Sequence, residues 1–367
     1  MRVSRKTGLL ALLVFFLTIG FGYGRSFAVH SLLEGMDKIA QGEFVEPLEE
    51  PSAEVLKIVE DAIDKKIRND TAIHLLRGVV LYTAKGQAGT AIVEYNRAIK
   101  LNPGYANTYL LRGLTYARGK DQYDRGIADI DKAIELSPSS ADAYLIRGLT
   151  YARVEGKYDQ ALSDINTAIE LSPSSADAYL TRGLTYARGK GQYDQAISDY
   201  NKSIALNQNS AKAYYNRGIA YVEKDELDMA IADFNKTLEL RPRLAEAYNN
   251  RGFAWFKKGI LDKAISDFNK ALGISPTCHA YNNRGIAWAA KGDFETAISD
   301  FNMALELNPS YAKAYINRGV AWAEKGDLQQ GLADVTRALS LEPMNKSYQD
   351  TLVFIQDLIR GEQTGDH

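Results

Sequence analysis

The sequence predicts an all-α protein in which one helical hairpin recurs along most of the chain. An Arg-Gly pair returns every 33 to 35 residues, and apolar or small residues follow helical spacing around each pair. Between residues 245 and 276 this spacing predicts two helices with a tight turn at Gly259, and Pro276 closes the unit. A hairpin of this size cannot bury its own apolar face. Successive copies must therefore stack, which predicts a solenoid.

The landmark pair occurs eight times, which predicts eight repeats between residues 70 and 344. The arginines of these pairs are Arg77, Arg112, Arg147, Arg182, Arg217, Arg251, Arg284 and Arg318. Since a solenoid grows in one dimension, we expect one repeat domain rather than the two or three globular domains that the length alone would suggest.

Each repeat carries an ordered pattern of aromatic, Gly, aromatic, small, aromatic, small and Pro. In the sixth repeat these positions are Tyr248, Gly252, Trp255, Ala264, Phe268, Ala271 and Pro276. The pattern resembles that of the tetratricopeptide-repeat (TPR) family, and the resemblance implies a right-handed α-solenoid superhelix of helix-turn-helix hairpins. The departures, which concern local packing, are His74, Gly126, Gly331, Thr237 and Gln208.

Arg251 lies eight residues before the turn at Gly259, and Asp267 lies eight residues after it. An antiparallel hairpin brings two such side chains level, so we expect an ion pair between the two helices. Every repeat has an acidic residue 16 or 17 positions after its landmark Arg, starting with Glu94 in the first repeat. We therefore interpret these regularly spaced acidic residues as structural rather than as a catalytic or ligand-binding ladder.

The ends of the chain differ from the repeats. Arg2, Arg5 and Lys6 precede an apolar run at 8–23, and Ser26-Phe27-Ala28 resembles a cleavage site. Residues 1–28 are therefore interpreted as a secretory signal peptide or as an uncleaved anchor in the inner membrane. Either interpretation exports the repeats, to the periplasm or beyond.

Two capping segments are expected beside the repeats. Residues 29–69 read as a linker and an N-terminal capping helix, with a partner-binding or dimerising helix as the alternative for 53–68. Residues 345–361 predict a C-terminal capping helix, and 362–367 a polar tail.

Composition excludes several function classes. The 367 residues carry a net charge of −2, which does not favour binding to nucleic acid. The four histidines are scattered and Cys278 is the sole cysteine, so the sequence predicts no metal site, no cofactor and no catalysis. Cys278 is interpreted as a small packing residue, with intermolecular pairing as the alternative.

A second stripe on the first helix of each repeat is the candidate binding surface, because in the family that the sequence resembles this stripe lines a concave groove. In the N-terminal half the stripe has two leucines and an arginine per repeat, namely Leu110, Leu114, Arg118, Leu145, Leu149, Arg153, Leu180, Leu184 and Arg188. Apolar patches rimmed by Arg predict an extended partner that alternates apolar and acidic residues. The alternative is ordinary solvated arginines inherited by duplication.

In the C-terminal half the stripe carries Phe253 and one Asn per repeat, at Asn216, Asn250, Asn283 and Asn317. A carboxamide offers a donor and an acceptor to a peptide group, and the row resembles the asparagine ladder of some peptide-gripping arrays in the family. The alternative is a local bond within each repeat.

The sequence thus predicts a non-enzymatic scaffold or adaptor that binds a protein or peptide partner in its groove. The alternative is a membrane-tethered structural or assembly subunit of a cell-envelope complex, which would touch the membrane only through its N-terminal segment.

Overall fold

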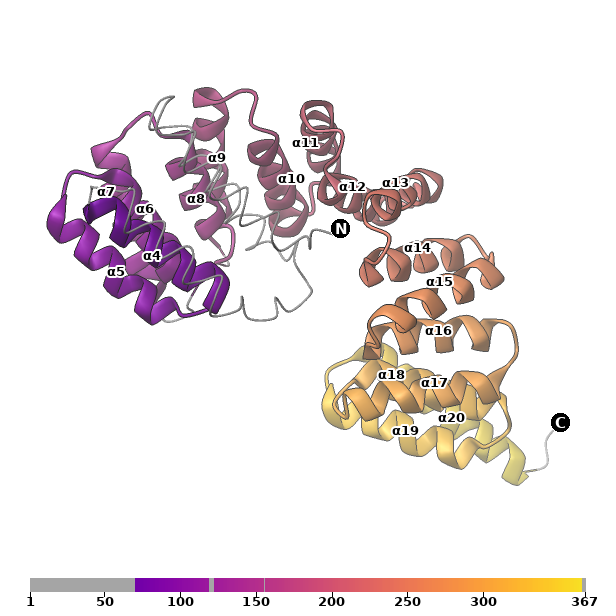
Figure 1. The fold of residues 1–367 in the computed structure, drawn as a ribbon. Helices are drawn as coiled ribbons and strands as arrows, with labels where there is room; N and C mark the ends of the chain where they lie inside the picture. Colours follow the sequence, from indigo (N-terminus) through magenta and orange to yellow (C-terminus); the bar gives the residue numbers. More distant parts are fainter. Residues whose placement is uncertain (1–69, 119–121, 155, 365–367) are drawn as a thin grey trace, which may run out of the picture. The chain divides into compact units, whose positions relative to one another are not determined.

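The computed structural model describes residues 70–118, 122–154 and 156–364, and within these ranges all regular structure is helical (Figure 1). The predicted all-α fold class is confirmed. The expected signal or anchor, the linker and the helix at 53–68 lie outside the described residues. No helix within the described ranges has both the length and the apolar character needed to cross a membrane.

The helices follow one another as antiparallel hairpins. The first helices of the hairpins are α4 (Asp70–Lys85), α6 (Ala106–Ala117), α8 (Ala141–Tyr151), α10 (Ala176–Lys190), α12 (Ala211–Glu223), α14 (Ala245–Lys257), α16 (Cys278–Ala290) and α18 (Ala312–Glu324). Their partners are α5 (Ala88–Leu101), α7 (Tyr123–Leu136), α9 (Tyr158–Leu171), α11 (Tyr193–Leu206), α13 (Leu227–Leu240), α15 (Leu261–Ile274), α17 (Phe294–Leu307) and α19 (Leu328–Leu341). A last helix, α20 (Lys346–Thr364), packs against α19.

The hairpin of α14 and α15 shows why this sequence forms it. Gly259 has φ 75°, a left-handed conformation that glycine adopts without steric cost, and it turns the chain as predicted. Gly252 lets the two helices approach closely, since a Cβ there would lie 2.8 Å from Cε1 of Phe268. Ala264 and Phe268 fill the buried space between the helices. Small residues on one helix therefore receive the aromatic ring of the other.

The chain divides into two compact units, residues 1–173 and 174–367. In the first unit Tyr95 of α5 and Leu110 and Leu111 of α6 belong to one buried cluster that reaches Ile146 of α8.

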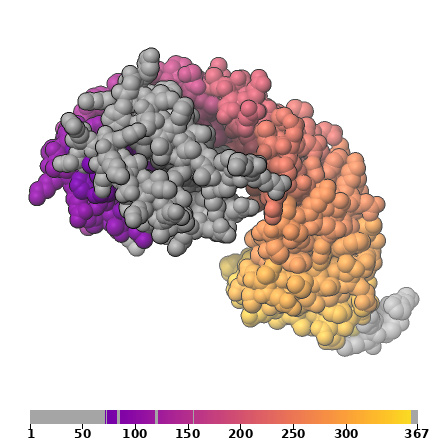
Figure 2. All heavy atoms as spheres, viewed as in Figure 1, coloured from indigo at the N-terminus to yellow at the C-terminus, as the bar shows by residue number. Residues whose placement is uncertain are grey.

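In the second unit each hairpin covers the next. Phe234 of α13 packs with Ala254 of α14, and Phe268 of α15 packs with Ala287 of α16. At its end Tyr348 of α20 packs in a cluster with Ala338 of α19. In the space-filling view the orange to yellow part of the chain forms a continuous packed surface (Figure 2). The core of this unit is thus a series of joined interfaces between hairpins.

Candidate functional site

The landmark arginines bind the carboxylates that the sequence analysis assigned to them. Arg251 donates from Nε to Oδ2 of Asp267 at 2.7 Å and from Nη2 to Oδ1 at 2.8 Å. The two side chains are 16% and 5% exposed, so a two-point, charge-assisted contact holds α14 to α15 away from water. The same pairing is made by Arg112 with Asp129, Arg147 with Asp164, Arg182 with Asp199, Arg217 with Asp233, Arg284 with Asp300 and Arg318 with Asp334. The predicted ion pair is confirmed in these seven hairpins.

The first hairpin differs. Glu94 lies 2.6 Å from Nδ1 of His74 and accepts a hydrogen bond from Arg97 at 2.5 Å. The pair of Arg77 with Glu94 stays a prediction.

Six landmark arginines make a further hydrogen bond that was not predicted from the sequence. Nη1 of Arg251 donates to Oδ1 of Asn235 on α13, at 2.6 Å, and the guanidinium lies 5.4 Å from the ring centre of Tyr248. The matching acceptors in other hairpins are Asn96, Asp131, Asn201, Asn269 and Asn302. The signal was present in the sequence, because each of these acceptors stands two residues after the regular acidic residue of the preceding repeat.

These contacts link three helices, two of one hairpin and one of the hairpin before it. The hydrogen bond to Asp233 is also the main cause that raises the pKa of Arg217 above its ordinary value. The arginine side chains are therefore occupied by structural contacts. They hold the first helices, and thereby the residues of the second stripe, in a fixed register.

Four leucines that the sequence analysis placed on the binding stripe are buried. Leu110, Leu145 and Leu180 are 1%, 8% and 3% exposed, and Leu114 is also buried. Leu110 packs in the cluster that includes Ile146 of the next hairpin. The expectation that these leucines face a partner is wrong, because all four are buried: Leu110 and Leu114 pack with residues of α8, and Leu180 packs with residues of α12.

The other predicted residues of the N-terminal half are partly accessible. Leu149 and Leu184 are half-buried, and Arg153 and Arg188 are exposed. Arg118 is half-buried, with its guanidinium 5.1 Å from the ring centre of Tyr82. Arg118 and Arg153 belong to the first unit, whereas Arg188 belongs to the second.

The asparagines of the C-terminal half behave in two ways. Asn216 is buried and donates to the carbonyl oxygen of Lys212 at 2.8 Å, which is the local bond of the alternative interpretation. Asn250, Asn283 and Asn317 instead bond to the preceding hairpin, through Nδ2.

Each of these three donors reaches the first helix of the hairpin before its own. The acceptors are Tyr215 Oη at 2.9 Å, Asn249 Oδ1 at 3.1 Å and Asn282 Oδ1 at 2.8 Å, in that order. Burial raises the pKa of Tyr215 to about 12, so its hydroxyl stays protonated at neutral pH. We call Asn250, Asn283 and Asn317 the asparagine row.

The donors of the asparagine row fix the orientation of each carboxamide. The oxygens of Asn283 and Asn317 accept no hydrogen bond from any residue that the structure describes. These two oxygens are therefore held in place and can accept a hydrogen bond from a bound partner.

An apolar row accompanies the asparagines. Phe253, Ile286 and Val320 each lie three residues after an asparagine of the row, a spacing that puts both residue types on the same side of the helix. Phe253 and Val320 are 39% and 41% exposed, and Ile286 is half-buried. Of these three, only Phe253 was predicted from the sequence, although an apolar residue directly follows the Arg-Gly pair in each of these repeats.

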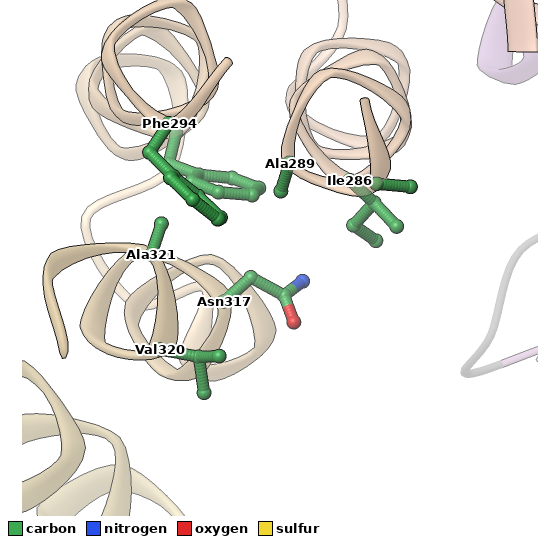
Figure 3. A pocket seen from close by; sticks show the side chains of 8 residues that line it. Ile286, Ala289, Phe294, Asn317, Val320 and Ala321 are labelled. Carbon is green, nitrogen blue, oxygen red and sulfur yellow. The ribbon is translucent and has the colours of Figure 1, made fainter. Parts of the chain in front are cut away.

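The two rows meet at a pocket of about 280 Å³ between α16 and α18 (Figure 3). Ile286, Ala289 and Ala290 line it from α16, and Phe294 and Phe301 from α17. The lining of α18 consists of Asn317, Val320 and Ala321. We call Phe253, Ile286, Val320 and the asparagine row, together with this pocket, the row surface.

Metal coordination and the single cysteine are two further chemical candidates in the described residues. No group of three His, Cys, Asp or Glu side chains lies close enough together in them to hold a metal ion. Cys278 Sγ lies 3.5 Å from Nδ1 of His279, whose ring contacts Tyr311 with a centroid distance of 5.1 Å. Cys278 is half-buried and belongs with the partly buried residues packed around Ala304 and Ala314, as expected for a packing residue.

Several solved structures share this fold. A chain of the APC/C hetero-tetramer Cut9–Hcn1 is 17% identical with a TM-score of 0.58; the match covers 82% of this chain and 59% of that chain. The type IV pilus biogenesis factor PilW is 20% identical with a TM-score of 0.53, covering 57% of this chain and 96% of its own.

A tetratricopeptide repeat protein from Parabacteroides merdae is 22% identical with a TM-score of 0.52, covering 69% and 98% of the two chains. This chain thus spans about 59% of the length of the Cut9–Hcn1 chain and nearly all of the other two. No protein of curated function is significantly similar in sequence.

Family models agree with the repeat pattern. Models described as "TPR repeat" match residues 69–119 and 188–225. Models described as "Tetratricopeptide repeat" match 110–176, 211–244, 245–278 and 279–311. Together these matches extend over well more than half of the sequence, through both units of the structure. The chain therefore belongs to the tetratricopeptide-repeat family.

Proposed function

We propose that the protein is a non-enzymatic interaction scaffold, and that the row surface binds an extended peptide segment of a partner protein. The observation that carries the proposal is the pairing of open carboxamide oxygens with exposed apolar side chains on successive first helices. An extended peptide presents backbone N–H groups and side chains at regular intervals. Asn283 and Asn317 would accept from the N–H groups, while Phe253, Ile286 and Val320 would contact apolar side chains.

Three lysines near this surface are paired with carboxylates. Lys257 is paired with Asp225 at 2.7 Å, Lys291 with Asp262 at 2.6 Å and Lys325 with Glu295 at 2.5 Å. The partner segment is therefore expected to be apolar here. The acidic residues that the sequence analysis expected in the partner would depend on Arg118, Arg153 and Arg188, which lie elsewhere.

The surface is also preorganised. Bonds between hairpins fix the asparagines, and the arginine contacts fix the helices that carry them. Because the scaffold does not need to be ordered on binding, most of the entropy cost falls on the peptide.

We further propose that residues 1–28 export the protein, so that the partner is a protein of the cell envelope or of the exterior. The membrane-tethered structural subunit is the second candidate. The exposed apolar side chains of α20 favour it, since Val353 and Phe354 are 54% and 59% exposed and offer a contact at the end of the array.

A selection experiment tests the peptide-binding proposal. A phage library of random 12-residue peptides is selected on the purified protein, and the affinity of an enriched peptide is measured by fluorescence anisotropy. Changing Asn283→Ala and Asn317→Ala together removes two hydrogen bonds of about 1 kcal/mol each, so Kd is expected to rise about 30-fold.

The matched control is Asn235→Ala with Asn302→Ala, which removes two asparagines that bond only to landmark arginines. The proposal is wrong if no peptide is enriched over a selection without protein. It is also wrong if the two double variants bind the enriched peptide equally well.

A further inference from the structure

The pocket of the row surface has a local cause in the sequence. The fifth and sixth residues after the landmark Arg are Phe256 and Lys257 in α14, but they are Ala289 and Ala290 in α16. Both alanines line the pocket. Alanine stands at the fifth position in the hairpins of α6, α8, α10 and α18 as well, but at the sixth position only in that of α16, so Ala290 distinguishes the hairpin that holds the volume of about 280 Å³.

The lining selects for an apolar group. Of its eight residues only Asn317 is polar, and Figure 3 shows Phe294 and Ala321 on the side opposite Ile286. The cation that follows the alanine pair, Lys291, is held by Asp262 at 2.6 Å. A charged group entering this pocket would lose water without gaining an opposite charge.

One polar atom is positioned to recognise the backbone next to such a group. Asn317 donates from Nδ2 to Oδ1 of Asn282 at 2.8 Å, so this nitrogen is engaged between the two hairpins. Its Oδ1 is consequently the atom left to accept a hydrogen bond at the pocket.

The volume indicates the size of the occupant. Sites for whole small-molecule ligands typically measure about 300 to 1,000 Å³. The pocket lies just below this range. It suits one large side chain rather than a complete cofactor or metabolite.

We propose that this pocket is the anchor site of the row surface, and that it takes one uncharged branched-aliphatic or aromatic side chain of the partner segment. Oδ1 of Asn317 accepts the backbone N–H of that same anchor residue. The assignment rests on the proposed function, because it names the residue class that the peptide-binding surface recognises.

Blocked amino acids test the pocket without any peptide. The N-acetyl N-methylamides of leucine, phenylalanine, lysine and glutamate are titrated into protein with labelled alanine methyl groups, followed by NMR. The leucine and phenylalanine probes are expected to shift the methyl signals of Ala289, Ala290 and Ala321, with affinity at least tenfold above that of the charged probes. Equal or stronger binding of the charged probes, or no shift of these signals, would overturn the anchor assignment.

Variants separate the pocket from the rest of the surface. Ala289→Phe introduces the residue that α14 carries at this position and fills the space, and the exposed Ala290→Trp blocks the rim should Ala289→Phe fail to fold. Both variants are expected to lower the affinity for the leucine probe at least tenfold. Ala232→Phe, on the exposed side of α13, is expected to leave this affinity unchanged. Asn317→Leu is expected to weaken binding of this probe as well.

The enriched library peptide distinguishes this inference from the proposed function. If the enriched peptides share one invariant apolar residue and bind the Ala289→Phe variant at least tenfold more weakly than the unchanged protein, both the proposed function and the anchor pocket are supported. A peptide that is lost in the double asparagine variant but binds Ala289→Phe normally leaves the proposed function standing and overturns the anchor pocket. Probe binding without any enriched peptide overturns the proposed function alone.

Discussion

Ser203 is a buried side chain in a position that other hairpins fill with alanine. It is 1% exposed, and its hydroxyl has no hydrogen-bond partner in the part of the chain that the structure describes. The equivalent residues Ala98, Ala168 and Ala271 are equally buried. Thr237 also occupies this position, but its hydroxyl donates to the carbonyl oxygen of Asp233 at 2.9 Å.

Ser203→Ala is therefore expected to raise the free energy of unfolding, by about 1 kcal/mol, because it removes an unpaired buried hydroxyl. Urea denaturation followed by circular dichroism measures the change. Ser198→Ala, on the exposed side of the same helix, is the control and is expected to leave stability unchanged. A destabilised Ser203→Ala would show that the hydroxyl makes a favourable contact.

Gly252 tests the close approach of two helices. A Cβ at this position would lie 2.8 Å from Cε1 and 2.9 Å from Cδ1 of Phe268, and 3.1 Å from the carbonyl oxygen of Ala264. Gly252→Ala is expected to lower the free energy of unfolding by about 1 to 3 kcal/mol, since the ring and the helix must shift.

Gly273 provides the matched control. It lies in the neighbouring helix α15, and a Cβ there meets nothing within 4 Å. Gly273→Ala is expected to leave stability unchanged or to raise it by up to about 1 kcal/mol, since alanine favours a helix more than glycine does. Equal losses in both variants would contradict the close-packing account.

At the scale of the helix, Arg251 joins α14 to α15 through Asp267 and to α13 through Asn235. Arg251→Ala leaves a buried carboxylate without its cation and is expected to cost about 3 kcal/mol. Asn235→Ala removes only one exposed hydrogen bond and is expected to cost less than about 1 kcal/mol.

A double-mutant cycle of Arg251→Ala with Asp267→Ala measures the coupling between the two side chains. Strong coupling is expected from the two short contacts. A coupling energy near zero would mean that the loss in Arg251→Ala comes from its packing over Tyr248 instead.

The elements also show which features a sequence can predict. The turn at Gly259 and the pair of Arg251 with Asp267 depend on spacing within one hairpin, and spacing is visible in the sequence. The burial of Leu110 depends on how the next hairpin packs over it, and the bond from Asn283 to Asn249 depends on the register of two separate helices. Such contacts are set by stacking, which the pattern of a single repeat does not contain.

The pocket illustrates the same limit. Its alanines are present in the sequence, but their effect becomes apparent only when α16 is compared with α14 in a common register. The apolar row was equally accessible in principle, because Ile286 and Val320 occupy the position of Phe253. The asparagines could be predicted because a repeated polar residue is conspicuous among apolar ones.

For the whole molecule, the division into two units predicts that the second can fold alone. Residues 174–367 contain their own series of interfaces, and Ser175 caps α10 by accepting from the backbone N–H of Ala178 at 3.2 Å. The fragment 174–367 is expected to be helical and to melt cooperatively by circular dichroism.

The comparison for this fragment is 193–367, which lacks α10 and exposes the buried face of α11, including Tyr200. It is expected to have a lower Tm than 174–367. A fragment 174–367 that shows no cooperative transition would mean that the first unit is needed to fold the second.

The central claim is that the row surface holds the partner peptide, and site-specific photocrosslinking tests it most directly. The photoreactive residue p-benzoylphenylalanine replaces Val320 on this surface or, as a control, the exposed Met303 on α17, and the library-selected peptide is added before irradiation. We expect a crosslinked product from position 320 and none from position 303. Crosslinking from position 303 with none from position 320 would place the peptide on the second helices and contradict the account.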